Sequence, residues 1–228
     1  MNFYERLQAE TADAQGYLLS APIIGRALAG QVTVDEYAAF LCQAYHHVRH
    51  TVPLLMATGA RLPAELEWLR AAVAEYIEEE VGHQDWVLAD IAACGLDSDK
   101  ARSSTPNFAT EMMVAYAYDT IQRVEPLGFF GMVHVLEGTS IGFADRAADA
   151  IQRALGLPDA AFTYLRSHGV LDLDHVRFFQ ELMDRIKDAR AQRAILHGAR
   201  NFYRLYGDVF RSIDGGQARL LACCGASV

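Results

Sequence analysis

One stretch of the sequence decides how the rest is interpreted, and it reads His168-Gly169-Val170-Leu171-Asp172-Leu173-Asp174-His175. His168, Asp172 and His175 stand at positions i, i+4 and i+7, so a helix would place all three side chains on one face. Gly169 lowers the helix propensity there, and His168 could instead lie on a loop or an unwound turn. The simpler alternative is a helix that starts at Asp172 as N-cap, with exposed histidines, but it explains the regular spacing less well.

Two other segments carry ionisable groups inside apolar, helix-patterned sequence. Glu80 and His83 are three residues apart and share a helix face, which is the spacing found in carboxylate-bridged dimetal bundles; Glu79, four residues before His83, is the alternative partner. Glu137 lies in the apolar stretch 127–143, where an unpaired carboxylate is costly to bury. The alternatives are a solvated acidic patch around His83, and an arginine partner or a polar groove for Glu137.

Together these segments offer three histidines and three carboxylates as candidate metal ligands: Glu80, His83, Glu137, His168, Asp172 and His175. Mixed imidazole and carboxylate ligation suits Fe(II), Mn(II) or Zn(II), and the excess of oxygen ligands disfavours a structural zinc site. Six protein ligands shared by two ions would leave coordination positions open, as binding of O2 and a substrate requires.

The composition predicts a single helical domain of a cytoplasmic protein. The chain has 228 residues, of which 52% are hydrophobic, and a net charge of −9. We therefore expect one domain over residues 1–214, followed by a loose tail over 215–228. The acidic surface argues against nucleic acid and membrane surfaces as partners, and the N-terminus lacks the pattern of a signal peptide. None of the four cysteines stands in a C-x-x-C pair.

Helical periodicity runs through almost the whole sequence, whereas strand signals are scarce. Thr33 and Glu36 form a capping box at the start of one long helix. The sequence thus predicts an all-α bundle. The expected helices cover about residues 2–18, 21–29, 33–60 with a kink at Pro53, 64–93, 108–124, 127–155, 160–165, 172–188 and 189–213, with a polar loop at 97–107.

The ligand pattern Glu80-x-x-His83, Glu137 and His168-x-x-x-Asp172-x-x-His175 resembles that of the heme-oxygenase-like diiron oxidases, over residues 21–206. The resemblance implies a seven-helix, TenA-like bundle that holds two Fe(II) ions, or manganese in their place, and no heme. It implies a biosynthetic oxidoreductase that uses O2 to fragment, desaturate or N-oxygenate a small amine- or carboxylate-bearing substrate. It assigns Glu80, His83 and His168 to one iron and the other three residues to the second.

The sequence departs from this family at one position, because some members carry a carboxylate seven residues before the first histidine, where this chain has Tyr76. We expect Tyr76, His134 and Tyr45 to be candidates for lining the substrate site. A homodimer is a common assembly for helical folds of this size.

Relatives with the same fold supply the competing hypotheses. The TenA-like group uses a cysteine in the central helix, and no cysteine lies between residues 95 and 222. Heme oxygenase uses a histidine near the N-terminus, whereas the first histidine here is His46. The main alternative is a metal-free enzyme or binding protein for a small heterocycle, and a further one is a scaffold protein.

Overall fold

The computed structural model describes residues 1–140 and 143–213, and for residues 168–175 it describes only the course of the backbone. Every regular element in this part of the chain is a helix, which confirms the all-α prediction. The tail at 215–228 lies outside the described residues and stays a prediction. In chain order the elements are α1 (Phe3–Leu19), α2 (Pro22–Leu28), α3 (Val34–Val48), α4 (Thr51–Arg61), η1 (Ala64–Leu66), α5 (Glu67–Glu80), α6 (His83–Ala93), α7 (Ser98–Ser103), α8 (Phe108–Asp119), η2 (Thr120–Val124), η3 (Pro126–Phe129), α9 (Phe130–Ser140), α10 (Ala144–Leu155), η4 (Asp159–Ala161), α11 (Thr163–Arg185) and α12 (Ala189–Ile213).

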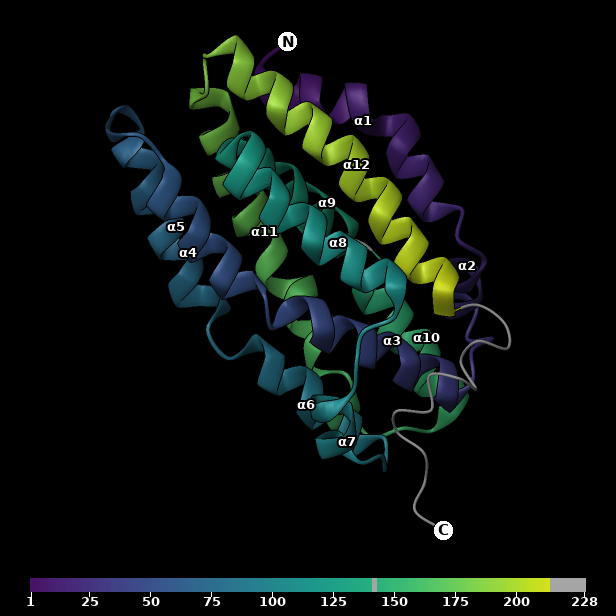
Figure 1. Cartoon of the computed structure of the whole chain (residues 1–228). Helices are drawn as coiled ribbons and strands as arrows, with labels where there is room; N and C mark the ends of the chain where they lie inside the picture. The colour runs from purple at the N-terminus through teal and green to yellow at the C-terminus, as the bar shows by residue number, and fades with distance from the viewer. Residues whose placement is uncertain (141–142, 214–228) are drawn as a thin grey trace.

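Helix α12 is the element against which much of the bundle packs. It lies beside α1 (Figure 1) and also contacts α8 and α9. Ile195, Ala199, Phe202 and Tyr206 recur at helical spacing along it, and all four are buried. This apolar stripe faces its neighbours and so removes the most hydrophobic face of the helix from water.

Glycines allow the backbones of α9 and α12 to cross closely. A Cβ on Gly131 would overlap the backbone nitrogen of Ala199 and would lie 2.7 Å from the carbonyl carbon of Gly198. A Cβ on Gly198 would overlap the carbonyl oxygen of Gly128 in η3. No side chain fits at these contacts, so the glycines fix how near α9, which carries Glu137, sits to α12.

Several expected long helices are each divided into shorter ones. The helix predicted over 33–60 begins with the expected capping box at Thr33 but breaks at Arg49 and His50, between α3 and α4. The predicted kink at Pro53 therefore appears one turn earlier, because a proline ring clashes with the carbonyl of the residue four positions before it. The helix predicted over 127–155 is divided into η3, α9 and α10.

Two further boundaries differ from the prediction. The loop expected at 97–107 contains the short helix α7, because the Asp97 side chain accepts hydrogen bonds from the amides of Asp99 and Lys100 and caps it. The segments expected at 160–165 and 172–188 belong largely to one helix, α11, whose backbone is helical through His168 and Gly169. Tertiary packing thus overrides the low helix propensity of that glycine.

The N-terminus of α11 is held by a residue from another helix. The Asp90 carboxylate of α6 accepts hydrogen bonds from the amides of Thr163 at 3.0 Å and Tyr164 at 2.8 Å. Burial raises the pKa of Asp90, although both amide bonds lower it. This cap fixes the start of α11 against α6 and satisfies two of the amides that every helix start leaves without partners.

Among the described helices, none is by itself long and apolar enough to cross a membrane. One bent pair, Pro126–Ser140 with Ala144–Leu155, meets the length and composition required only when both parts are joined across a 48° bend.

Candidate functional site

The junction between α5 and α6 places Glu80 next to His83. Glu80 ends α5, Val81 is extended, and Gly82 takes a φ of 97°, after which α6 begins at His83. The predicted continuous helix is therefore wrong here, yet the two side chains still meet, with 3.0 Å between Nδ1 of His83 and Oε2 of Glu80. His83 is buried and stacks on Trp86, with 4.1 Å between ring centroids. A turn, instead of a shared helix face, thus pairs the imidazole with the carboxylate.

The Gly82→Ala variant tests the role of this turn. An added Cβ at Gly82 would meet nothing within 4 Å, so an alanine side chain fits sterically. The positive φ of Gly82, however, disfavours any residue with a side chain. We expect a loss of about 1–2 kcal/mol in the free energy of unfolding, measured by urea denaturation. Gly25→Ala, at a helical position with equal free space, should not destabilise the protein. Equal stabilities of the two variants would contradict the strain argument.

Helix α9 brings a second carboxylate to this region. Glu137 lies close enough to the buried hydroxyl of Tyr76 in α5 to act on it electrostatically. Burial raises the pKa of Tyr76 well above its usual value, and the charges of Glu137, Glu79 and Glu80 raise it further. The pKa of Tyr4 is also raised by burial and by Glu137. These shared effects show that the carboxylates of α5 and α9 lie within electrostatic range of one phenol.

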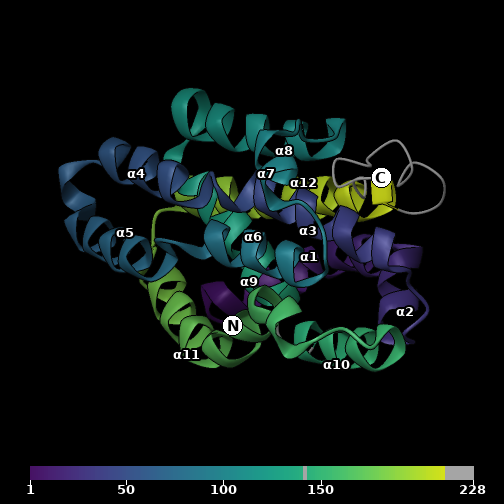
Figure 2. The same cartoon turned by 90° about the horizontal axis from the view of Figure 1, so that it is seen from below.

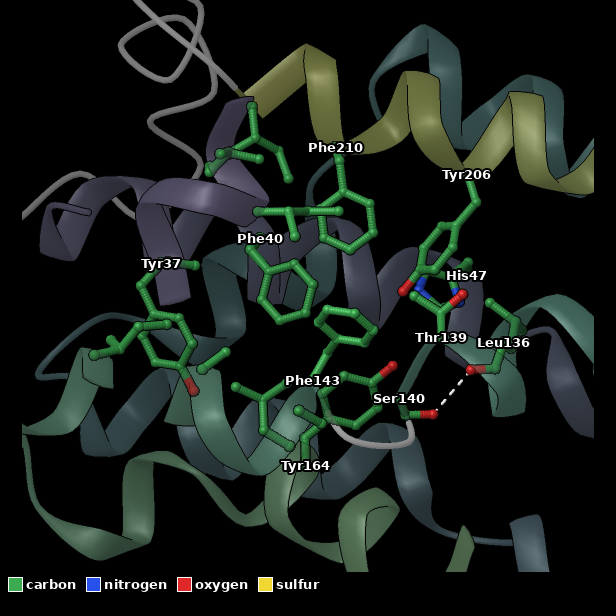
Figure 3. A pocket seen from close by; sticks show the side chains of 18 of the residues that line it. Tyr37, Phe40, His47, Leu136, Thr139, Ser140, Phe143, Tyr164, Tyr206 and Phe210 are labelled. Atoms are coloured by element: carbon green, nitrogen blue, oxygen red, sulfur yellow. Dashed lines mark hydrogen bonds between the residues drawn. The ribbon is translucent and has the colours of Figure 1, made fainter. Parts of the chain in front are cut away.

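Glu80 and Glu137 both line a cavity of about 180 Å³. It is enclosed by side chains of α2, α3, α9, α10 and α12, together with the start of α11 and single residues of α1, α4 and α5. Figure 3 shows its aromatic walls, with Tyr206, His47 and Thr139 grouped at one end and Tyr37 toward the other. The candidate ligands therefore face a largely apolar space that is small beside the roughly 300–1,000 Å³ of common ligand sites.

The structure distinguishes Glu79 from Glu80, the two candidates for the first carboxylate ligand. Glu79 is exposed and absent from the cavity lining, whereas Glu80 is partly buried within it. This difference favours Glu80 as the ligand.

The residues expected to line the substrate site are not among those that line this cavity, and their role stays a prediction. In the part of the chain that the structure describes, Tyr45, Tyr76 and His134 lie outside the cavity lining. Tyr45 contacts the ring of His46 and the guanidinium of Arg49. His134 packs against aromatic rings, and burial lowers its pKa to about 4, so its imidazole is neutral near pH 7.

The third predicted ligand segment lies on α11, but the side chains of His168, Asp172 and His175 are outside the described residues. Helix α11 packs against α6, which begins with His83, and against α9, which carries Glu137 (Figure 2). Among the described residues, no group of three or more histidine, cysteine, aspartate or glutamate side chains could hold a metal ion. Convergence of all six predicted ligands on one centre thus stays a prediction.

The donors that are described fit iron in their chemistry. Carboxylate oxygens and an imidazole are the ligand types of nonheme Fe(II) and Mn(II) sites. They come from three elements, and the two carboxylates line a low-polarity cavity, where negative charge is costly without a cation.

Most of the cavity wall is formed by residues that carry no functional signal in the sequence. Tyr37, Phe40, Phe143, Tyr164 and Phe210 line the cavity, but aromatic residues at helical spacing resemble ordinary core residues. Phe40 and Phe210 stack at 5.9 Å between centroids, which joins α3 to α12. No signal in the sequence distinguishes an aromatic beside a void from one beside another side chain.

The solved structures to which this chain is similar share one fold, which is heme oxygenase-like. Residues 38–207 match the model of a family described as iron-containing redox enzymes. A domain of unknown function with a heme oxygenase-like fold from Shewanella denitrificans OS217 is 24% identical, with a TM-score of 0.83 over 100% of this chain and 97% of that chain. A TenA homologue from Pseudomonas syringae pv. tomato is 10% identical, with a TM-score of 0.78 over 92% of each chain.

Heme oxygenase-1 from the cyanobacterium Synechocystis, solved in complex with heme, is 12% identical, with a TM-score of 0.74 over 97% of this chain and 96% of that chain. At these identities the solved structures establish the heme oxygenase-like fold alone. Among curated proteins, no sequence matches the chain.

Proposed function

The chain belongs to the family of iron-containing redox enzymes, and from this premise we propose that it is a nonheme diiron oxidase that oxidises a small organic substrate with O2. The observation that carries the proposal is that Glu80 and Glu137, from separate helices, line one cavity, with His83 paired to the first. Glu80, His83 and Glu137 would hold iron together with the α11 residues His168, Asp172 and His175. Bound iron would supply the electrons that reduce O2 and the oxidising power that acts on the substrate.

The protein's own residues position the ligands. The buried Tyr76 phenol lies beside the Glu137 carboxylate. Trp86 fixes the plane of the His83 ring by stacking. The apolar walls of the cavity place low-polarity side chains beside the carboxylates, which strengthens their attraction for a cation.

The two neighbouring glutamates provide the test. We expect Glu80→Gln to weaken iron binding by roughly 100-fold or more, because a neutral amide is a poorer ligand than a carboxylate and loss of a direct ligand should exceed the 10- to 100-fold cost of losing an outer partner. Glu79→Gln, the matched change at the exposed neighbour, should leave iron binding unchanged. Iron per chain, measured by elemental analysis after anaerobic loading with Fe(II), gives the answer. If the two variants lose iron equally, or neither does, the assignment of Glu80 is wrong.

A heme-dependent and a metal-free function are the alternatives within this fold. Helix α1 contains no histidine, which disfavours heme bound at the N-terminal helix. The likeness to TenA homologues favours a metal-free protein for a small heterocycle. Two irons per chain, with no Soret absorbance after addition of heme, would support the diiron proposal. Absence of iron after anaerobic loading would support the metal-free alternative.

A further inference from the structure

We propose that the cavity beside Glu80 and Glu137 selects a primary amine with an apolar alkyl or aryl body, and discriminates against the matching carboxylate. The inference deepens the proposed function, on which it rests in taking this cavity as the substrate site. Three features of the described lining carry it: a row of aromatic rings, hydroxyls that accept hydrogen bonds, and the balance of charges.

The aromatic rings form a nearly continuous row along the cavity. Tyr37 stacks on Phe40 at 6.3 Å and Phe40 on Phe210 at 5.9 Å. Phe210 contacts Tyr206 at 4.8 Å, and Tyr206 meets His47 edge-on at 5.7 Å. Figure 3 shows these rings around one space. Aromatic faces bind an apolar body by burial and attract a cation through the ring quadrupole.

Two hydroxyls at the Tyr206 end of the cavity, those of Thr139 and Ser140, favour a ligand that donates hydrogen bonds. The Thr139 hydroxyl donates to the carbonyl of Val135 at 2.5 Å, and the Ser140 hydroxyl donates to that of Leu136 at 2.8 Å. Since a hydroxyl has only one hydrogen to donate, both oxygens can only accept from a ligand. An ammonium group has three donors and no acceptor, whereas a carboxylate has only acceptors.

The charges of the lining also favour an ammonium group over a carboxylate. The described lining residues include Glu36, Glu80 and Glu137 but neither lysine nor arginine. Glu36 is engaged by Arg26 at 2.7 Å, a contact that also lowers its pKa. A carboxylate ligand would therefore meet accepting hydroxyls and negative charge, and no lysine or arginine of the described lining would offset them, whereas an ammonium group is compatible with both.

Calorimetric titration of the full chain with three probes of one shape tests the proposal. The probes are 2-phenylethylamine, 2-phenylethanol and phenylacetate, each added to metal-free protein and to protein loaded anaerobically with Fe(II). We expect the amine to bind at least tenfold more tightly than phenylacetate in both forms. Tighter or equal binding of phenylacetate would overturn the proposal, and so would failure of the amine to bind.

A matched pair of variants locates the effect in the cavity. Thr139→Val removes an accepting oxygen with little change in shape, and we expect amine binding to weaken severalfold while phenylacetate binding does not. Thr58→Val is the control, because Thr58 makes the same bond to its own helix, to Leu54, but is not part of the cavity lining. Equal effects of the two changes would contradict the assignment.

The proposed ligand class and the proposed oxidase function can be refuted independently of each other. Protein that takes up no iron but prefers the amine would refute the oxidase function and keep the ligand class. Protein that binds two irons and consumes O2 but prefers phenylacetate would support the oxidase function and refute the ligand class.

Discussion

Replacing Glu137 by glutamine is expected to lower iron-dependent O2 consumption by roughly 100-fold or more, because loss of a direct ligand should exceed the 10- to 100-fold cost of losing an outer partner. Glutamine keeps the size of the side chain and an oxygen that can accept from the nearby Tyr76 hydroxyl, so the fold should persist. Removing a negative charge from the cavity edge should leave metal-free protein as stable as the parent, or more stable. One preparation serves for all measurements: elemental analysis gives the iron content, O2 uptake gives the activity, and urea denaturation gives the free energy of unfolding.

A purely structural Glu137 predicts a different result. In that case Glu137→Gln would lower the stability of metal-free protein and leave iron content unchanged. Glu78→Gln, at an exposed position of α5 outside the cavity lining, is the control for any general effect of changing the net charge. If it lowers iron content as much as Glu137→Gln does, the specific role of Glu137 is refuted.

Replacing Gly131 by alanine should cost about 3 kcal/mol in the free energy of unfolding, the largest stability effect that we expect in this protein. The added Cβ would overlap the backbone of α12 at Ala199 and Gly198, and backbone cannot move aside as a flexible side chain can. Urea denaturation followed by circular dichroism at 222 nm measures the loss. Folded protein that remains should also bind iron less well, since α9 carries Glu137.

Gly16→Ala is the matched control, because this helical glycine of α1 has nothing within 4 Å of an added Cβ. Alanine should stabilise the helix there by up to about 1 kcal/mol. If Gly131→Ala is tolerated as well as Gly16→Ala, the close crossing of α9 and α12 is not what positions these helices.

The parts of the fold that local sequence determines were predictable. The Thr33–Glu36 capping box starts α3 as expected, and Gly156 ends α10 with a φ of 66°. The start of α11 was not predictable, because it depends on Asp90, which lies far away in the sequence. The break at Gly82 was missed for a related reason: a glycine tolerates a helix and a turn alike, and only the surrounding packing decides between them.

The candidate site was predictable to the same limited extent. The spacing indicated that Glu80 and His83 would meet, and they do, through a turn that the pattern did not contain. Glu137 was singled out because a carboxylate in apolar sequence needs a partner, and Tyr76 is one. The cavity itself could not be foreseen, since hydrophobic periodicity shows which face of a helix is buried but not where the packing leaves a void.

Anomalous diffraction at the iron K-edge, from crystals of protein loaded anaerobically with Fe(II), tests the central claim most directly. We predict two iron peaks within bonding distance of Glu80, His83, Glu137 and the α11 residues His168, Asp172 and His175. Iron peaks elsewhere, such as beside His46 and His50, or no iron peak in fully loaded crystals, would contradict the claim.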